Sequence, residues 1–251
     1  LYPVKLGFNE KVFAVLAFSD QAKMDVNIKL TERRLYEAEK LIVENKVNDS
    51  NVTVLQKTFQ KETEKISKKI DVLNEKKMYD SAIMATSNFE SLLKAHGKIL
   101  KNISLKEVEG APRNLLQEVL KSEQGATMKK NITKENIFKG EGVNGGITQE
   151  SIKQNLTFAE NEILTARATI KSKKDKIGKQ AVLEAENNLI FAQEKINEGK
   201  ASVDAKDFNK AFSVFSDAVG IAKQTENLVK AKGGLNVDFS IEISTPKNEN
   251  K

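Results

Sequence analysis

Residues 24–42 read MDVNIKLTERRLYEAEKLI, and residues 152–170 read IKQNLTFAENEILTARATI. In both stretches apolar side chains recur at alternating steps of three and four residues, the spacing of one face of an α-helix. Each of the six positions in the first stripe has a counterpart 128 residues later, and only Thr31 is polar. The twelve positions are Met24, Ile28, Thr31, Leu35, Ala38 and Ile42, and then Ile152, Leu156, Ala159, Ile163, Ala166 and Ile170.

Two further stripes repeat in the same order. One runs from Val52 to Leu73 and recurs at an offset of 130 residues, with Ile70 rather than Lys69 facing the core. Another runs from Tyr79 to Ile103 and recurs at an offset of 129. A single amphipathic helix cannot bury its own stripe, and antiparallel packing of three helices buries all of them. The sequence therefore predicts an all-α protein of two tandem antiparallel three-helix modules, with about 75% helix.

Composition and capping residues divide the chain into four parts. We expect a first module at 1–110, a short helix and linker at 111–147, a second module at 148–232 and a tail at 233–251. Thr148 and Ser151 have the chemistry of a helix N-terminus and are expected to open the second module.

The linker prediction rests on glycine. A short helix is expected over residues 113–124, and Gly125 to Gly146 holds five glycines and too few apolar residues for a core. Such a segment is typical of a flexible connection. Trypsin should then cut first within it and release two stable modules. The expected sites are Lys129, Lys130, Lys134 and Lys139.

The tail alternates apolar and polar residues from Leu235 to Ile243, which is strand spacing. Three interpretations stay open at this point. The segment is a lone edge ribbon on the helices, a strand completed by a partner, or a frayed tail.

Basic residues give the candidate contact sites. The formal net charge is +6 and the densest basic run is Lys171, Lys173, Lys174, Lys176 and Lys179. This run is either a solvated turn between helices or a contact for a polyanion or an anionic lipid. Arg33 and Arg34 can pair with Glu37 one turn away, and they are the second candidate contact for an anion or a partner.

Composition removes most catalytic chemistry. The chain has 0 Cys and 1 His, so thiol chemistry and a two-histidine metal site are excluded. The single His96 lies in an apolar stripe, where a core-edge histidine with one hydrogen bond is expected. Neither a phosphate-binding loop nor a nucleophile elbow is present. We therefore expect no catalytic residue, no metal and no cofactor.

A resemblance of two sequence motifs to those of a known family implies where the protein is located. The opening Leu1-Tyr2-Pro3-Val4-Lys5 and the later Glu32-Arg33-Arg34-Leu35-x-Glu37-Ala38 are similar to motifs of a family of bacterial extracytoplasmic helical domains of unknown function. The resemblance covers about the first 45 residues well, and Thr31 stands where that family usually has Ala. It implies a helical fold outside the cytoplasmic membrane, a precursor that is secreted or membrane-anchored, and no catalytic residue.

These observations lead to one functional hypothesis and two alternatives. The leading hypothesis is a non-enzymatic exported helical scaffold or protein-interaction module of a bacterial cell envelope, whose partner is a protein or an envelope component. The first alternative is a binder of anionic polymer, with envelope polysaccharide favoured over nucleic acid because no aromatic residues interleave the lysines. The second alternative is an enzyme that depends on His96.

Overall fold

The computed structural model describes residues 20–46, 49–104, 111–139 and 147–243, and these ranges contain seven helices and no strand. The helices are α2 (Asp20–Val43), α3 (Asp49–Glu75), α4 (Tyr79–Ser104), α5 (Ala111–Phe138), α6 (Gln149–Ile177), α7 (Lys179–Asp204) and α8 (Phe208–Leu235). They hold about three quarters of the chain, so the all-α prediction is confirmed.

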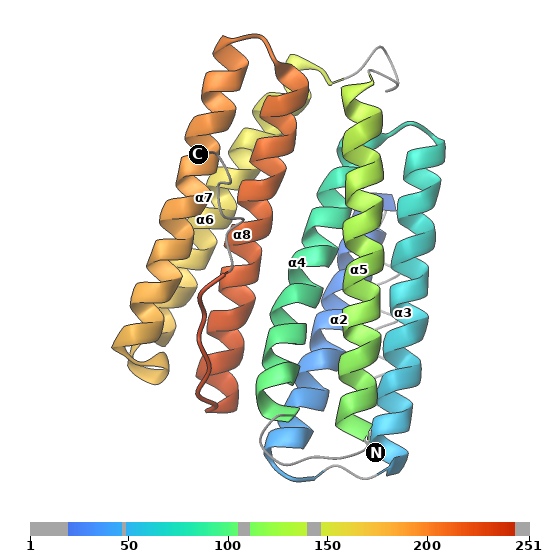
Figure 1. Ribbon diagram of the computed structural model, residues 1–251, viewed down its shortest axis with the longest axis vertical. Helices are drawn as coiled ribbons and strands as arrows, with labels where there is room; N and C mark the ends of the chain where they lie inside the picture. Colours follow the sequence, from blue (N-terminus) through green and yellow to red (C-terminus); the bar gives the residue numbers. More distant parts are fainter. Residues whose placement is uncertain (1–19, 47–48, 105–110, 140–146, 244–251) are drawn as a thin grey trace, which may run out of the picture.

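The helices form two groups that lie side by side (Figure 1). One group contains α2, α3, α4 and α5, and the other contains α6, α7 and α8. Helices α4 and α8 face one another where the groups meet. Helices α2, α4, α6 and α8 run in one direction, whereas α3, α5 and α7 run in the other.

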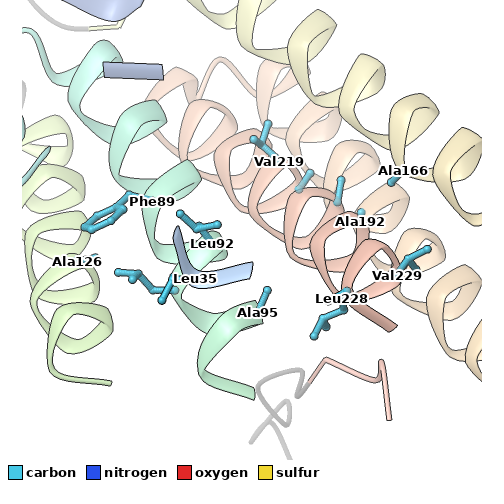
Figure 2. Close-up of a cluster of buried hydrophobic side chains, with 14 of the residues drawn as sticks. Leu35, Phe89, Leu92, Ala95, Ala126, Ala166, Ala192, Val219, Leu228 and Val229 are labelled. Atoms are coloured by element: carbon cyan, nitrogen blue, oxygen red, sulfur yellow. The ribbon is translucent and has the colours of Figure 1, made fainter. Parts of the chain in front are cut away.

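A single hydrophobic core extends through both groups. Figure 2 shows Leu92 and Ala95 of α4 on the side toward Val219 and Leu228 of α8. Of the twelve stripe positions quoted at the outset, ten are buried, and Ile28 and Leu156 are half-buried. Each large apolar side chain buried in this way contributes about 1.5–3 kcal/mol relative to exposure.

Local chemistry sets the helix ends. Thr148 and Ser151 form the predicted cap of α6, in which the Ser151 amide donates to Thr148 Oγ1 and the Thr148 amide donates to Ser151 Oγ, both at 3.1 Å. Helices α2, α3 and α7 each end with a left-handed residue and a pair of closing backbone hydrogen bonds. The left-handed residues are Asn45, Lys77 and Lys206.

The predicted linker was wrong over residues 125–138, where α5 continues as a helix to Phe138. The missed stripe uses small and polar side chains, because Ala126 and Thr133 are buried between Val119 and Ile137. Ion pairs add to it, and they involve all four lysines that were expected to be cut first, although the pair of Lys139 is exposed. These pairs join Lys129 to Asp71, Lys130 to Glu90 at 2.9 Å, Lys134 to Asp217 at 2.8 Å and Lys139 to Glu135 at 2.8 Å.

The tail differs from a strand as well. Gly233 and Gly234 belong to α8, so the helix extends beyond the predicted boundary at 232. Residues 236–243 then pack on the helices as a single segment with Phe239 and Ile241 buried. The side chain of Asn188 supplies the pairing that a neighbouring strand would give. It donates from Nδ2 to the Ile241 carbonyl at 3.0 Å and accepts from the Ile243 amide at 3.2 Å.

No helix among the described ranges has the length and apolar character needed to cross a bilayer. The opening motif Leu1-Tyr2-Pro3-Val4-Lys5 and the glycines at 140–146 lie outside the described residues.

Candidate functional site

A cleft of about 380 Å³ opens between α2, α4, α6 and α8. It draws side chains from both helix groups: Arg33 and Tyr36 come from α2, Lys173 from α6 and Lys230 from α8. The cleft therefore exists only because the two groups are packed together.

The only histidine of the chain contributes to the wall of this cleft. His96 Nδ1 of α4 lies 2.7 Å from Glu39 Oε1 of α2, and the two side chains are 3% and 0% exposed. The predicted core-edge histidine with one hydrogen bond is thus confirmed. His96 Nε2 and Glu39 Oε2 are buried and have no hydrogen-bond partner among the described residues.

Burial and pairing act in opposite directions on these two groups. Burial disfavours the charged imidazole, but the charge and hydrogen bond of Glu39 outweigh it, so the pKa of His96 lies above its ordinary value. Burial also raises the pKa of Glu39, and His96 offsets this only in part. The pair thus holds a proton more strongly than either isolated group would.

The rim of the cleft is mainly cationic. Lys29, Arg33, Lys173 and Lys230 line it together with one carboxylate, that of Glu32. Arg33 Nε lies 3.0 Å from Glu37 Oε1. Lys230 Nζ lies 2.9 Å from Glu226 Oε1. Lys29, Lys173 and Glu32 form no ion pair with a described residue.

Two glycines let α8 approach its neighbours at the cleft. A Cβ atom added at Gly234 would overlap the hydroxyl of Tyr36, and one added at Gly233 would lie 3.2 Å from Cδ of Lys173. The stem of Lys173 therefore runs against the last turn of α8. This contact places Lys173 at the junction of α6 and α8.

The structure separates the predicted site residues into three environments. Arg33 and Lys173 line the cleft. Arg34 is only 8% exposed, and its Nη1 lies 2.8 Å from Glu37 Oε2, which confirms the expected pairing one turn away. The remaining lysines are exposed around the turn from α6 to α7, namely Lys171, Lys174, Lys176 and Lys179.

Sequence reasoning missed Glu39, Lys29 and Lys230. Glu39 directly follows the stripe residue Ala38, so its position beside the core was visible in the sequence, but its partner was not. Lys29 and Lys230 carry no signal of their own, because they look like any exposed lysine on an amphipathic helix.

The described residues also contain a second cleft but no group of metal ligands. A second cleft of about 320 Å³ lies toward the other end of the same four helices and holds Asp25, Asp80 and Asn155. The described residues contain no group of three or more His, Asp or Glu side chains that could hold a metal ion.

A family model matches residues 1–136 of the chain, and its description reads Domain of unknown function (DUF5667). This match takes in α2, α3, α4 and nearly all of α5. No curated protein and no solved structure matches the chain significantly.

Proposed function

The chain belongs to the DUF5667 family of domains of unknown function, and on that premise we propose that it is a non-enzymatic helical module of a bacterial cell envelope that binds a partner in the α2–α4–α6–α8 cleft. The observation that carries the proposal is the orphan nitrogen of His96. A buried polar atom without a hydrogen bond costs about 1–3 kcal/mol. A partner group at this position would offset that cost.

A binding role is favoured over catalysis by the lining of the cleft. None of its residues is Ser, Thr or Cys, so the cleft lacks the aliphatic hydroxyl and thiol nucleophiles that pair with a histidine base. The other groups are cations, a phenol, an amide and one carboxylate, which suit recognition of a charged ligand.

A second candidate function rests on the exposed lysines of the α6–α7 turn. Lys171, Lys174, Lys176 and Lys179 form no ion pair with a described residue, and Lys173 connects them to the cleft. This surface would bind an anionic envelope polymer. Because such binding releases counterions, its affinity should fall steeply with salt. Affinity for an acidic polysaccharide that is the same at low and high salt would argue against this candidate.

The same proposal includes two tandem modules related by duplication. The starts of α2 and α6 are 129 residues apart, those of α3 and α7 are 130 apart, and those of α4 and α8 are 129 apart. Lys77 and Lys206, also 129 apart, both adopt a positive φ at the turn before the third helix. In this proposal α5 fills the groove beside α3 and α4, and residues 236–243 occupy the matching place beside α7 and α8.

The extracytoplasmic location rests on the motif resemblance at the start of the chain. Fractionation of a native host should recover the natural protein outside the cytoplasmic membrane or attached to its outer face. Recovery of the intact protein from the cytosol alone would overturn the location.

Site-specific photo-crosslinking in a native host tests the binding role. A crosslinking amino acid replaces Asn227, which lines the cleft, and in a matched control it replaces Asn197, which is exposed on α7. We expect a discrete adduct from position 227 only. Equal adducts from both positions, or none from position 227, would refute the cleft as the binding site.

A further inference from the structure

Cations outnumber carboxylates among the residues that line the cleft. Lys29, Arg33, Lys173 and Lys230 face it together with the single carboxylate of Glu32. Glu37, which Arg33 shares with Arg34, and Glu226, which pairs with Lys230, do not line the cleft.

We call the position of buried His96 in the cleft lining the floor of the cleft; its Nε2 atom has no hydrogen-bond partner among the described residues. An imidazolium donates from both ring nitrogens. When His96 is protonated, which is the state that pairing with Glu39 favours, Glu39 accepts from Nδ1 and Nε2 is an N–H donor with no acceptor among the described residues. This buried donor distinguishes the cleft from a cluster of surface lysines.

From these observations we infer that the cleft binds an oxyanion group, with His96 Nε2 as the donor at the floor and Lys173 and Lys29 as the cations at the rim. The inference rests on the proposed binding function and names its ligand chemistry. A carboxylate or a phosphate oxygen accepts from both kinds of group, and charge assistance strengthens these hydrogen bonds. A cleft of about 380 Å³ is in the size range of small-molecule sites.

Glu32 gives the site selectivity. Its carboxylate faces the same cleft and repels an anion that approaches it. The charge of Glu32 also reaches His96, so we expect an oxyanion on the Lys173 side of the imidazole. A cationic ligand is disfavoured, because it would meet an N–H donor at the floor and several cations at the rim.

The single histidine makes the test direct. In the full chain, the imidazole ¹⁵N signals of His96 are followed by NMR while inorganic phosphate, succinate or choline is added. We expect a saturable shift of Nε2 with phosphate or with succinate, which tells a phosphoryl ligand from a carboxylate ligand, and no shift with choline.

Neighbouring lysines provide the matched variants. Lys173→Gln removes a cleft cation and should weaken binding about tenfold, as expected for loss of one charge-assisted contact. Lys174→Gln changes the adjacent exposed lysine and should leave the affinity within about twofold of the wild type. Lys174 is exposed, and glutamine keeps the Cβ and Cδ atoms by which Lys173 lies against α8, so neither variant requires the core to repack.

The outcomes separate this inference from the proposed function. A shift with choline alone, no saturable shift with either anion, or equal weakening by both lysine variants would overturn the oxyanion site. If the crosslink from position 227 persists in that case, the cleft binds its partner through other chemistry. If the anions bind as expected and the crosslink is absent, the binding role in the cell is the part that fails.

Discussion

His96 and Glu39 tie α4 to α2 across 57 residues of sequence. Removing one member of a buried pair leaves the other without compensation, and this costs about 3–5 kcal/mol. We expect His96→Ala and Glu39→Ala each to lower the free energy of unfolding by about that amount. The double variant should lose clearly less than the sum of the two.

Urea denaturation of the four proteins measures this coupling. Losses that add within about 0.5 kcal/mol would mean that the two side chains act independently, and the pairing would then be wrong.

The same pair predicts how stability depends on pH. The pKa of His96 is raised in the folded chain, so the stabilisation is fully present below the unfolded pKa and is lost as pH rises through the folded pKa. We expect the free energy of unfolding to fall over the pH interval that begins at about 6.5, the ordinary pKa of histidine.

The double variant His96→Gln/Glu39→Gln is the control for this pH dependence. It removes both titrating groups of the pair and the chain has no other histidine, so the profile should be nearly flat over the same interval. A wild-type stability that rises over this interval would mean that burial rather than Glu39 dominates the pKa of His96.

How far the sequence could predict these residues depends on the kind of signal each carries. His96 was placed correctly because the stripe from Tyr79 to Ile103 fixes its face. Its partner Glu39 was missed, because the pairing depends on which turn of α2 lies beside α4, and a periodic pattern does not contain that register. Lys29 and Lys230 become site residues only through the packing of α8 on α2.

The prediction from the sequence was least accurate for helix α5. Apolar counting ended it near residue 124, because its later core positions are Ala126, Thr133 and Ile137 rather than large aliphatic residues. Its ion pairs to α3, α4 and α8 depend on neighbours that the chain reaches only after folding. By contrast, the stripes of α2 and α6 consist mostly of aliphatic side chains, and their faces were predicted correctly.

Two glycine-to-alanine variants test two features of the helices: the helical state of α5 at Gly125 and the close packing of α7 on α8 at Gly199. Gly125 lies inside α5 with no atom within 4 Å of an added Cβ, so Gly125→Ala should raise the free energy of unfolding by about 0.5–1 kcal/mol. Gly199 of α7 lies against the ring of Phe215, where an added Cβ would overlap the ring. Gly199→Ala should therefore destabilise the protein by about 1–3 kcal/mol.

The denaturation midpoints of the two alanine variants are compared with that of the wild type. No gain from Gly125→Ala would favour a flexible segment at this position. An unchanged midpoint for Gly199→Ala would show that α7 and α8 are less closely packed than described.

The two helix groups share one core, although similar apolar stripes recur in both. Ser216 Oγ of α8 lies 3.9 Å from the sulfur of Met84 in α4, and an added Cβ at Gly220 would lie 3.2 Å from Ser91 Oγ. Lys130 and Lys134 of α5 both reach Asp217 of α8, at 3.1 and 2.8 Å. The sequence expectation of two separately stable modules is therefore replaced by that of one cooperative unit.

The shared core matters for the cleft, because residues of both helix groups line it. If α6 and α8 moved independently of α2 and α4, Lys173 and Lys230 would not stay near His96. A ligand that binds only the assembled cleft must stabilise both groups at once, since binding to the folded state alone raises its stability by mass action.

Scanning calorimetry of the full chain, with and without the anion that shifts the His96 signal, tests this connection most directly. We predict one unfolding transition whose Tm rises with anion concentration, and a smaller rise for Lys173→Gln than for Lys174→Gln. Two separate transitions, or a single transition that no anion shifts, would contradict a binding cleft held between two halves of one cooperative molecule.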